Sequence, residues 1–168
     1  KRETRRPDLT IKFTKVTLES RVPTLIKGEI DLECANTSNA AELRKTVAFT
    51  IPTYFSTTRM MVREGSGINS IFDLANKTVN TTRGSRGETI FNEANASRTL
   101  SAKNLVTDDF DGSFSVMETD KADAFILDDV LLYTMRAASK SKTMYVLTPA
   151  SLSVEPLSLM LRKDDPTF

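Results

Sequence analysis

Short apolar segments typical of strands alternate with helix-like segments along most of this chain, and this order constrains the fold more than any other feature. The clearest strands lie at residues 55–62, 78–82 and 124–127, which are rich in β-branched, aromatic and other apolar residues. Helices are expected between them, for example at 88–94 and 113–119. Such alternation predicts an α/β fold with largely parallel sheets.

The remaining elements are expected from weaker signals of the same kind. Residues 9–16 alternate between apolar and polar side chains, and we expect a strand there. Ser20 is placed to cap a short helix that ends at Gly28, and Asn39 with Glu42 to cap a helix through Lys45. Further strands are expected at 30–35, 104–107, 145–147 and 157–161, and further helices at 70–74 and from 129 to about 139.

Composition excludes several functional classes. The chain of 168 residues is 39% hydrophobic with nine Phe, which suffices for a core, and it contains no apolar run of about 18 residues that would cross a membrane. The net charge is +1, and only residues 1–6 are locally basic, so we expect no nucleic-acid partner. The absence of His excludes Ser-His-Asp and Cys-His catalysis and the usual catalytic zinc sites. The single Cys34 is interpreted as a buried small hydrophobe in strand 30–35.

The segment 78–91 is the best candidate for an anion site. Gly84 and Gly87 bracket a predicted turn between a strand and a helix, which places Ser85, Arg86 and unpaired backbone N–H groups at a helix N-terminus. Such a terminus binds small anions. The spacing lacks the Gly-Lys-Ser/Thr of a phosphate loop, so a carboxylate fits better than a nucleotide. The alternative is an ordinary strand–helix turn with solvated arginines.

Polar residues also follow two predicted strands at their carboxyl ends. Asn36 and Ser38 follow strand 30–35, and Asp128 and Asp129 follow strand 124–127. Because open α/β sheets bind ligands at the carboxyl ends of their strands, we expect Asn36, Ser38, Ser85 and Asp128 to face one cleft between two lobes. The alternative for Asp128 is an N-cap of the helix that begins at Asp129.

Several of these segments together resemble a known family. The run 20–34, Arg59, the Gly84-Ser85 pair and the segments 124–129 and 161–166 are similar to the periplasmic solute-binding proteins of polar amino-acid ABC importers (family 3), closest to the glutamate/aspartate-binding branch. The resemblance implies the type II periplasmic binding protein fold, two Rossmann-like lobes with a ligand cleft between them. Lobe one would comprise residues 1–55 and 151–168, and lobe two residues 56–150. The family's first strand would precede Lys1 and its last helices would follow Phe168, so the chain is expected to be incomplete at both ends.

The resemblance also implies a function. The protein would capture an amino acid or related small carboxylate outside the cytoplasm, in the periplasm, and deliver it to the permease of an ABC importer. It would be no enzyme, and it would carry no cofactor, no metal and no membrane-inserted segment in this chain. Alternatives on the same fold are the ligand-sensing extracellular domain of a receptor or kinase and a dehydratase of prephenate-like acids.

Site residues carry over from the family position by position. Asp128 falls on the acid that binds the ligand ammonium, and Arg21 on the arginine that holds a side-chain carboxylate. Four further positions, a hydroxyl pair and the two hydroxyl positions of a Gly-Ser/Thr-Thr turn, give the remaining polar candidates: Asn36, Ser38, Ser85 and, in place of the second turn hydroxyl, Arg86.

The chain departs from the family at three other ligand positions. Leu43 replaces the arginine for the α-carboxylate, Phe110 replaces a histidine, and Leu18 replaces a serine. Arg44 lies next to Leu43, but one residue along a helix turns a side chain by about 100°. Arg86 is therefore expected to contribute more to carboxylate binding than Arg44. The resemblance does not specify the ligand.

Overall fold

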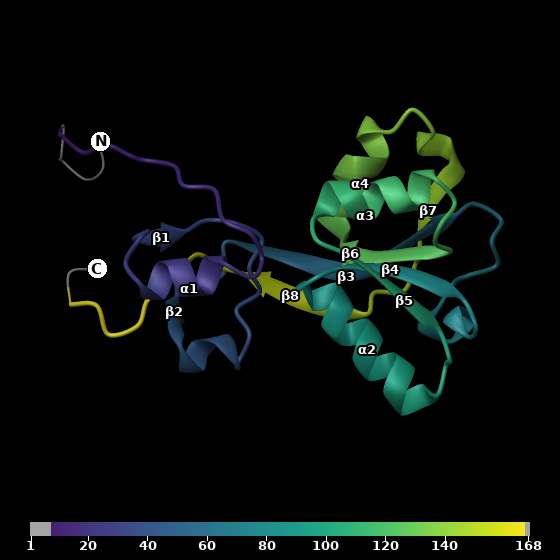
Figure 1. Ribbon diagram of the computed structural model, residues 1–168, viewed down its shortest axis with the longest axis horizontal. Helices are drawn as coiled ribbons and strands as arrows, with labels where there is room; N and C mark the ends of the chain where they lie inside the picture. Colours follow the sequence, from purple (N-terminus) through teal and green to yellow (C-terminus); the bar gives the residue numbers. More distant parts are fainter. Residues whose placement is uncertain (1–7, 167–168) are drawn as a thin grey trace.

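The computed structural model describes residues 8–166, which form two β-sheets linked by long crossing strands (Figure 1). The basic start of the chain lies outside the described residues. The smaller sheet has the order β1-β9-β2, with β1 at Leu32–Glu33, β9 at Met160–Arg162 and β2 at Val47–Phe49, all antiparallel. Helix α1 (Arg21–Ile26) lies against it, and Leu25, Val47 and Met160 form its core.

The larger sheet has the order β5-β4-β6-β3-β7, and β8 pairs with β3 beside this path. Its strands are β3 (Tyr54–Arg63), β4 (Thr78–Thr82), β5 (Lys103–Thr107), β6 (Ala124–Asp128), β7 (Tyr145–Leu147) and β8 (Ser153–Leu157). Only the β4–β5 and β4–β6 pairings are parallel among the described residues. The prediction of largely parallel sheets is therefore wrong, because β3 pairs antiparallel with β6, β7 and β8.

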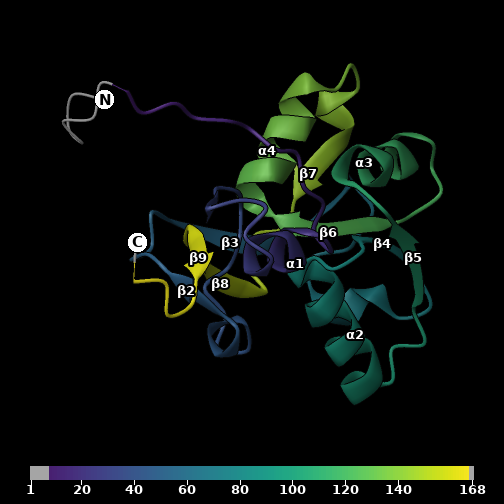
Figure 2. The same cartoon turned by 60° about the vertical axis from the view of Figure 1, so that its left-hand side comes forward.

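Helices cover both faces of the larger sheet (Figures 1 and 2). Helix α2 (Arg86–Arg98) packs on one face, and α3 (Phe110–Glu118) and α4 (Asp129–Ala138) pack on the other. Two buried clusters fill these layers, one around Phe91 and Ile126 and the other around Phe125 and Leu132. Three short 3-10 helices complete the elements: η1 (Leu43–Lys45), η2 (Ile71–Leu74) and η3 (Lys142–Met144).

Strands β3 and β8 run from the larger sheet toward the smaller one and hold the two together (Figure 1). The first half of β3 pairs with β8, from Tyr54 opposite Leu157 to Thr58 opposite Ser153. The loop after β1 is tied to β8, because Ser38 forms a β-bridge with Leu157 and the Asn39 N–H donates to the Pro156 carbonyl at 2.8 Å. Asn36 of the same loop contacts Asp128 at the carboxyl end of β6.

Most predicted elements are confirmed, but residues 9–16 are not a strand. They form no regular element, and Ile11 is 75% and Phe13 92% exposed. Alternating polarity specifies only the side-chain period, whereas a strand also needs a neighbour that accepts and donates its backbone hydrogen bonds. No described strand pairs with this segment.

The interpretation of Cys34 as buried is also wrong, because Cys34 is exposed and its neighbour Glu33 is buried. The Thr37 hydroxyl donates to Glu33 Oε1 at 2.9 Å, and the Arg21 Nη1 lies 3.9 Å from the same oxygen. Since a shift of one residue exchanges the two faces of a strand, these partners decide which side chain points inward.

The predicted strand at 157–161 is in fact two strands that belong to different sheets. Strand β8 ends at Leu157 on β3, and β9 begins at Met160 between β1 and β2. The apolar run carries no Gly or Pro to mark the break. The chain instead changes partners there, because it passes from the larger sheet to the smaller one.

Candidate functional site

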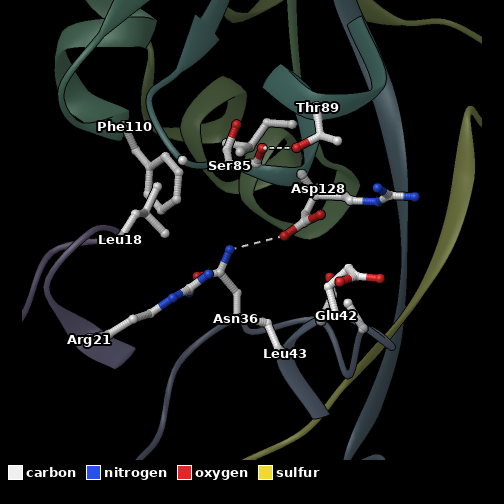
Figure 3. Close-up of a pocket in the computed structure, with 14 residues that line it drawn as sticks. Leu18, Arg21, Asn36, Glu42, Leu43, Ser85, Thr89, Phe110 and Asp128 are labelled. Carbon is white, nitrogen blue, oxygen red and sulfur yellow. Dashed lines mark hydrogen bonds between the residues drawn. The ribbon is translucent and has the colours of Figure 1, made fainter. Parts of the chain in front are cut away.

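A cavity of about 260 Å³ lies between the two sheets (Figure 3). Its lining comes from both sides: Leu18, Arg21, Asn36, Ser38, Ala40, Glu42 and Leu43 from the smaller-sheet side, and Gly84, Ser85, Arg86, Thr89, Phe110, Leu127 and Asp128 from the larger-sheet side. The prediction that Asn36, Ser38, Ser85 and Asp128 face one cleft is confirmed by this lining. A volume below the usual 300–1,000 Å³ of drug-sized pockets suits a small ligand.

Asp128 presents a buried carboxylate to this cavity. It ends β6 and stands at the N-cap position of α4, yet its side chain makes no capping hydrogen bond. Its Oδ2 instead accepts a hydrogen bond from Asn36 Nδ2 at 3.0 Å, 92 residues away in sequence (Figure 3). Burial raises the pKa of Asp128 above its ordinary value, and the Asn36 bond offsets part of that shift. Asp128 thus occupies the N-cap position that the alternative gave it, but its side chain turns to Asn36 instead of capping α4.

The neighbouring Asp129 has a structural role. Its Oδ1 accepts from the Val130 N–H at 2.8 Å and from the Ser56 hydroxyl at 2.8 Å, and its Oδ2 from the Thr57 hydroxyl at 2.6 Å. Partial burial opposes ionisation, but the bonds from Thr57 and Ser56 outweigh it and hold the pKa of Asp129 below its ordinary value. Asp129 thus fastens α4 to β3, which leaves Asp128 available to the cavity.

Arg21 supplies the most buried positive charge of the cavity. Its side chain is 12% exposed, and its Nη1 is buried with no hydrogen-bond partner among the described residues. Burial lowers the pKa of Arg21, and the charges of Glu33 and Asp128 oppose that shift. Burial also raises the pKa of Glu33, which weakens its hold on Arg21 as an ion-pair partner. A buried donor without an acceptor costs about 1–3 kcal/mol, so an anionic group in the cavity would relieve that cost.

The turn before α2 differs from its prediction in one respect. The helix begins at Arg86 rather than 88, with Ser85 as N-cap, because the Glu88 N–H donates to Ser85 Oγ at 3.1 Å. The Gly84 N–H in turn donates to Glu88 Oε2 at 2.7 Å. The Ser-x-x-Glu spacing is the signal that identifies this start. Gly87 lies inside the first turn of the helix, where a Cβ would lie 2.3 Å from the Ile126 carbonyl oxygen.

The other two arginine candidates are already engaged within the chain. Arg86 lines the cavity, but its Nε donates to Glu155 Oε1 at 3.0 Å. Arg44 does not line the cavity, and its Nε donates to Asn39 Oδ1 at 2.6 Å. Because Leu43 lines the cavity, the turn of about 120° per residue in the 3-10 helix η1 carries Arg44 away from it. Asn39 therefore does not cap a helix, and only the 3-10 turn η1 forms there.

Sequence reasoning missed several lining residues. Thr89 lies one turn after Ser85 on α2, a four-residue spacing that places two side chains on one helix face. Glu42 also lines the cavity and accepts a hydrogen bond from Lys45 Nζ at 2.6 Å. Ala40 and Leu127 carry no chemical signal that would have identified them. The three departures noted from the sequence, Leu18, Leu43 and Phe110, all line the cavity and form apolar wall.

The described residues show neither a membrane span nor a metal site. None of their helices has the length and apolar character to cross a membrane. Nor do the described residues bring together a group of three or more His, Cys, Asp or Glu side chains that would hold a metal ion.

Two sheets joined by crossing strands, with a cavity between them, define the type II periplasmic binding protein fold. A solved arginine-bound mutant of ArgBP from T. maritima superposes with a TM-score of 0.85 at 25% identity, covering 98% of this chain and 74% of that one. The family described as bacterial extracellular solute-binding proteins, family 3, matches residues 3–168, and the chain belongs to it.

Two curated relatives are named as binding proteins for acidic amino acids. One is the glutamate/aspartate import solute-binding protein of Escherichia coli K12, 33% identical over 168 residues, which are 100% of this chain and 56% of the relative. The other is the L-glutamate/L-aspartate-binding protein of Pseudomonas aeruginosa, 32% identical, with the same 100% and 56% coverage. The chain thus spans about half the length of these relatives.

Proposed function

We propose that this chain belongs to a periplasmic solute-binding protein that captures an amino acid or related small carboxylate and delivers it to the permease of an ABC importer. We assign the described residues 8–55 and 151–166 to lobe one and residues 56–150 to lobe two. The single observation that carries the proposal is the cavity that brings the buried Asp128 and the partly buried Arg21 together from the two sides. A negative and a positive group in one small space match the two charges of an amino acid. The protein acts by binding, without catalysis.

Each charged group has a role in this proposal. The ligand ammonium donates to Asp128, beside the bond that Asn36 already makes to the same carboxylate. The ligand carboxylate accepts from the Arg21 guanidinium, and the hydroxyls of Ser38, Ser85 and Thr89 provide further hydrogen bonds from the wall. Closure of the lobes about β3 and β8 removes water, which strengthens these charge-assisted bonds.

A thermal-shift screen tests the proposal. A panel of the twenty amino acids and matched small carboxylates without an amine is added to the protein, and the melting temperature is read for each. A ligand that binds only the folded state raises the melting temperature, and we expect at least one amino acid to do so more than its amine-free counterpart. No shift with any amino acid would contradict the proposal.

Arg21 and Arg44 are expected to differ in their effect on ligand binding. Arg21→Gln should weaken binding of the responding amino acid by about tenfold or more, since it removes a charge-assisted bond worth about 1.5–3 kcal/mol. Arg44→Gln is the matched control and should change affinity by less than about twofold, because its guanidinium binds Asn39 outside the cavity. Arg86→Ala should lower ligand affinity more than Arg44→Ala, because Arg86 lines the cavity and Arg44 does not. Isothermal titration ranks the variants, and a larger loss at Arg44 would contradict this assignment.

Ligand affinity and stability without ligand are expected to respond oppositely to pH. The pKa values of Asp128 and Glu33 are raised by burial, so the folded state binds more protons than the unfolded chain. Stability without ligand should therefore rise as pH falls from the raised toward the ordinary pKa values. Affinity should fall over the same range, because an ammonium binds the ionised Asp128. Thermal melts and titrations between about pH 7 and about pH 4 measure both. Affinity that increased on acidification would contradict the role of Asp128.

A further inference from the structure

We propose that the cavity selects an amino acid with a single carboxylate and no net negative charge, in preference to glutamate or aspartate. This inference rests on the proposed function and specifies its substrate class. It separates the chain from the relatives named above for acidic amino acids. The reason is that the chain supplies its own carboxylates to the places where a second ligand carboxylate would bind.

The first such place is Arg86. Its Nε donates to Glu155 Oε1 at 3.0 Å, and Glu155 is buried. The Ser153 hydroxyl donates to the same oxygen at 2.6 Å, which holds the carboxylate in position. Arg86 lines the cavity with a charge that Glu155 already balances. A ligand carboxylate at Arg86 would lie beside the buried carboxylate of Glu155, which it would have to displace or be repelled by.

The second place is the N-terminus of α2, which borders the cavity through Gly84, Ser85 and Arg86. Glu88 lies in the first turn, and its Oε2 accepts from the Gly84 N–H at 2.7 Å. The Glu88 N–H is itself bonded to Ser85 Oγ. The helix end therefore already carries a carboxylate, whose negative charge opposes a second one.

The charges of the wall give the same result. Among the described lining residues the cations are Arg21 and Arg86 and the acids are Glu42 and Asp128, of which Glu42 is paired with Lys45. Behind the two arginines stand the buried acids Glu33 and Glu155. A zwitterion pairs one charge with Asp128 and one with Arg21 and adds no net charge. The second carboxylate of glutamate meets no uncompensated cation in this wall. The free-energy cost of removing that carboxylate from water is therefore not offset by an ion pair.

The remaining surface of the cavity is apolar. Leu18, Leu43, Phe110 and Leu127 form this part of the wall, with Leu18 and Phe110 on one side and Leu43 below Asp128 in Figure 3. Hydrocarbon donates no hydrogen bond to a carboxylate. An uncharged side chain loses much less on entering such a surface than an ionised one.

Pairs of ligands with the same shape and different charge test the inference. Isothermal titration of the protein with glutamine and glutamate, and with asparagine and aspartate, should give the uncharged member at least about tenfold tighter binding in each pair that binds. Equal or tighter binding of the acidic members would overturn the inference and leave the proposed function standing. Absence of binding by every amino acid would overturn the proposed function, and the inference with it.

A variant at Glu155 tests the cause. Glu155→Gln removes the charge that balances Arg86, and the affinity ratio of the neutral to the acidic ligand should fall by at least about threefold. Ser153→Ala is the matched control, since it deletes a bond to Glu155 and keeps the charge, and its ratio should stay within about twofold. Melting curves confirm that both variants fold. An unchanged ratio in Glu155→Gln would overturn the charge-balance argument.

Discussion

Replacement of Asp128 by asparagine is expected to weaken binding of an amino-acid ligand by about ten- to a hundredfold, the worth of one charge-assisted hydrogen bond of about 1.5–3 kcal/mol. Stability without ligand should be unchanged or higher. The Asp128 carboxylate is buried, its pKa is raised by that burial, and its side chain makes no capping bond to α4. Asparagine keeps an oxygen to accept from Asn36. Titration measures the affinity, and urea unfolding measures the stability.

Asp129→Asn is the control for Asp128→Asn, and its expected effects are the reverse. The Asp129 carboxylate accepts from Ser56, Thr57 and Val130, so the loss of its charge should lower the free energy of unfolding by about 1–3 kcal/mol. Affinity should change little, because Asp129 does not line the cavity. A variant of Asp128 that lost stability but kept its affinity would show that Asp128 has a structural role instead.

Gly87→Ala is expected to lower the free energy of unfolding much more than the same substitution at Gly112. The added Cβ would lie 2.3 Å from the carbonyl oxygen and 2.9 Å from the carbonyl carbon of Ile126, which are backbone atoms of the central strand β6. Helix α2 must therefore move away from the sheet, at a cost of about 3 kcal/mol that exceeds the gain of about 1 kcal/mol in helix propensity. Urea unfolding should show an earlier midpoint with a similar slope.

Gly112→Ala provides the comparison for Gly87→Ala on another helix, α3. Its Cβ would meet the Asp109 Oδ1 at 3.0 Å, the end of a side chain that can shift. We expect its loss of stability to be less than half that of Gly87→Ala. The movement of α2 should also displace Ser85 and Arg86 and weaken ligand binding. Equal stability losses in the two variants would contradict the role of the close helix–strand contact.

The sequence by itself determined most of the local structure and the set of polar candidates. Period and turn residues located the helix before Gly28, the central strands and, to within two residues, the start of α2. Polar residues at strand ends placed Asn36, Ser38, Ser85 and Asp128 in one cavity. These features are local, or follow from the rule that ligands gather at the carboxyl ends of strands, so a single sequence carries them.

The tertiary structure alone decided which charges are free and which backbone segments pair. The partner of Arg86 is Glu155, 69 residues away, and no spacing in the sequence indicates that contact. The inward side of β1 is set by the bonds of Glu33 rather than by the apolarity of Cys34. Residues 9–16 have the pattern of a strand without a paired neighbour, and 157–161 divides between two sheets. Periodicity fixes which side chains share a face, whereas hydrogen-bond and charge partners are set by segments that only the fold brings together.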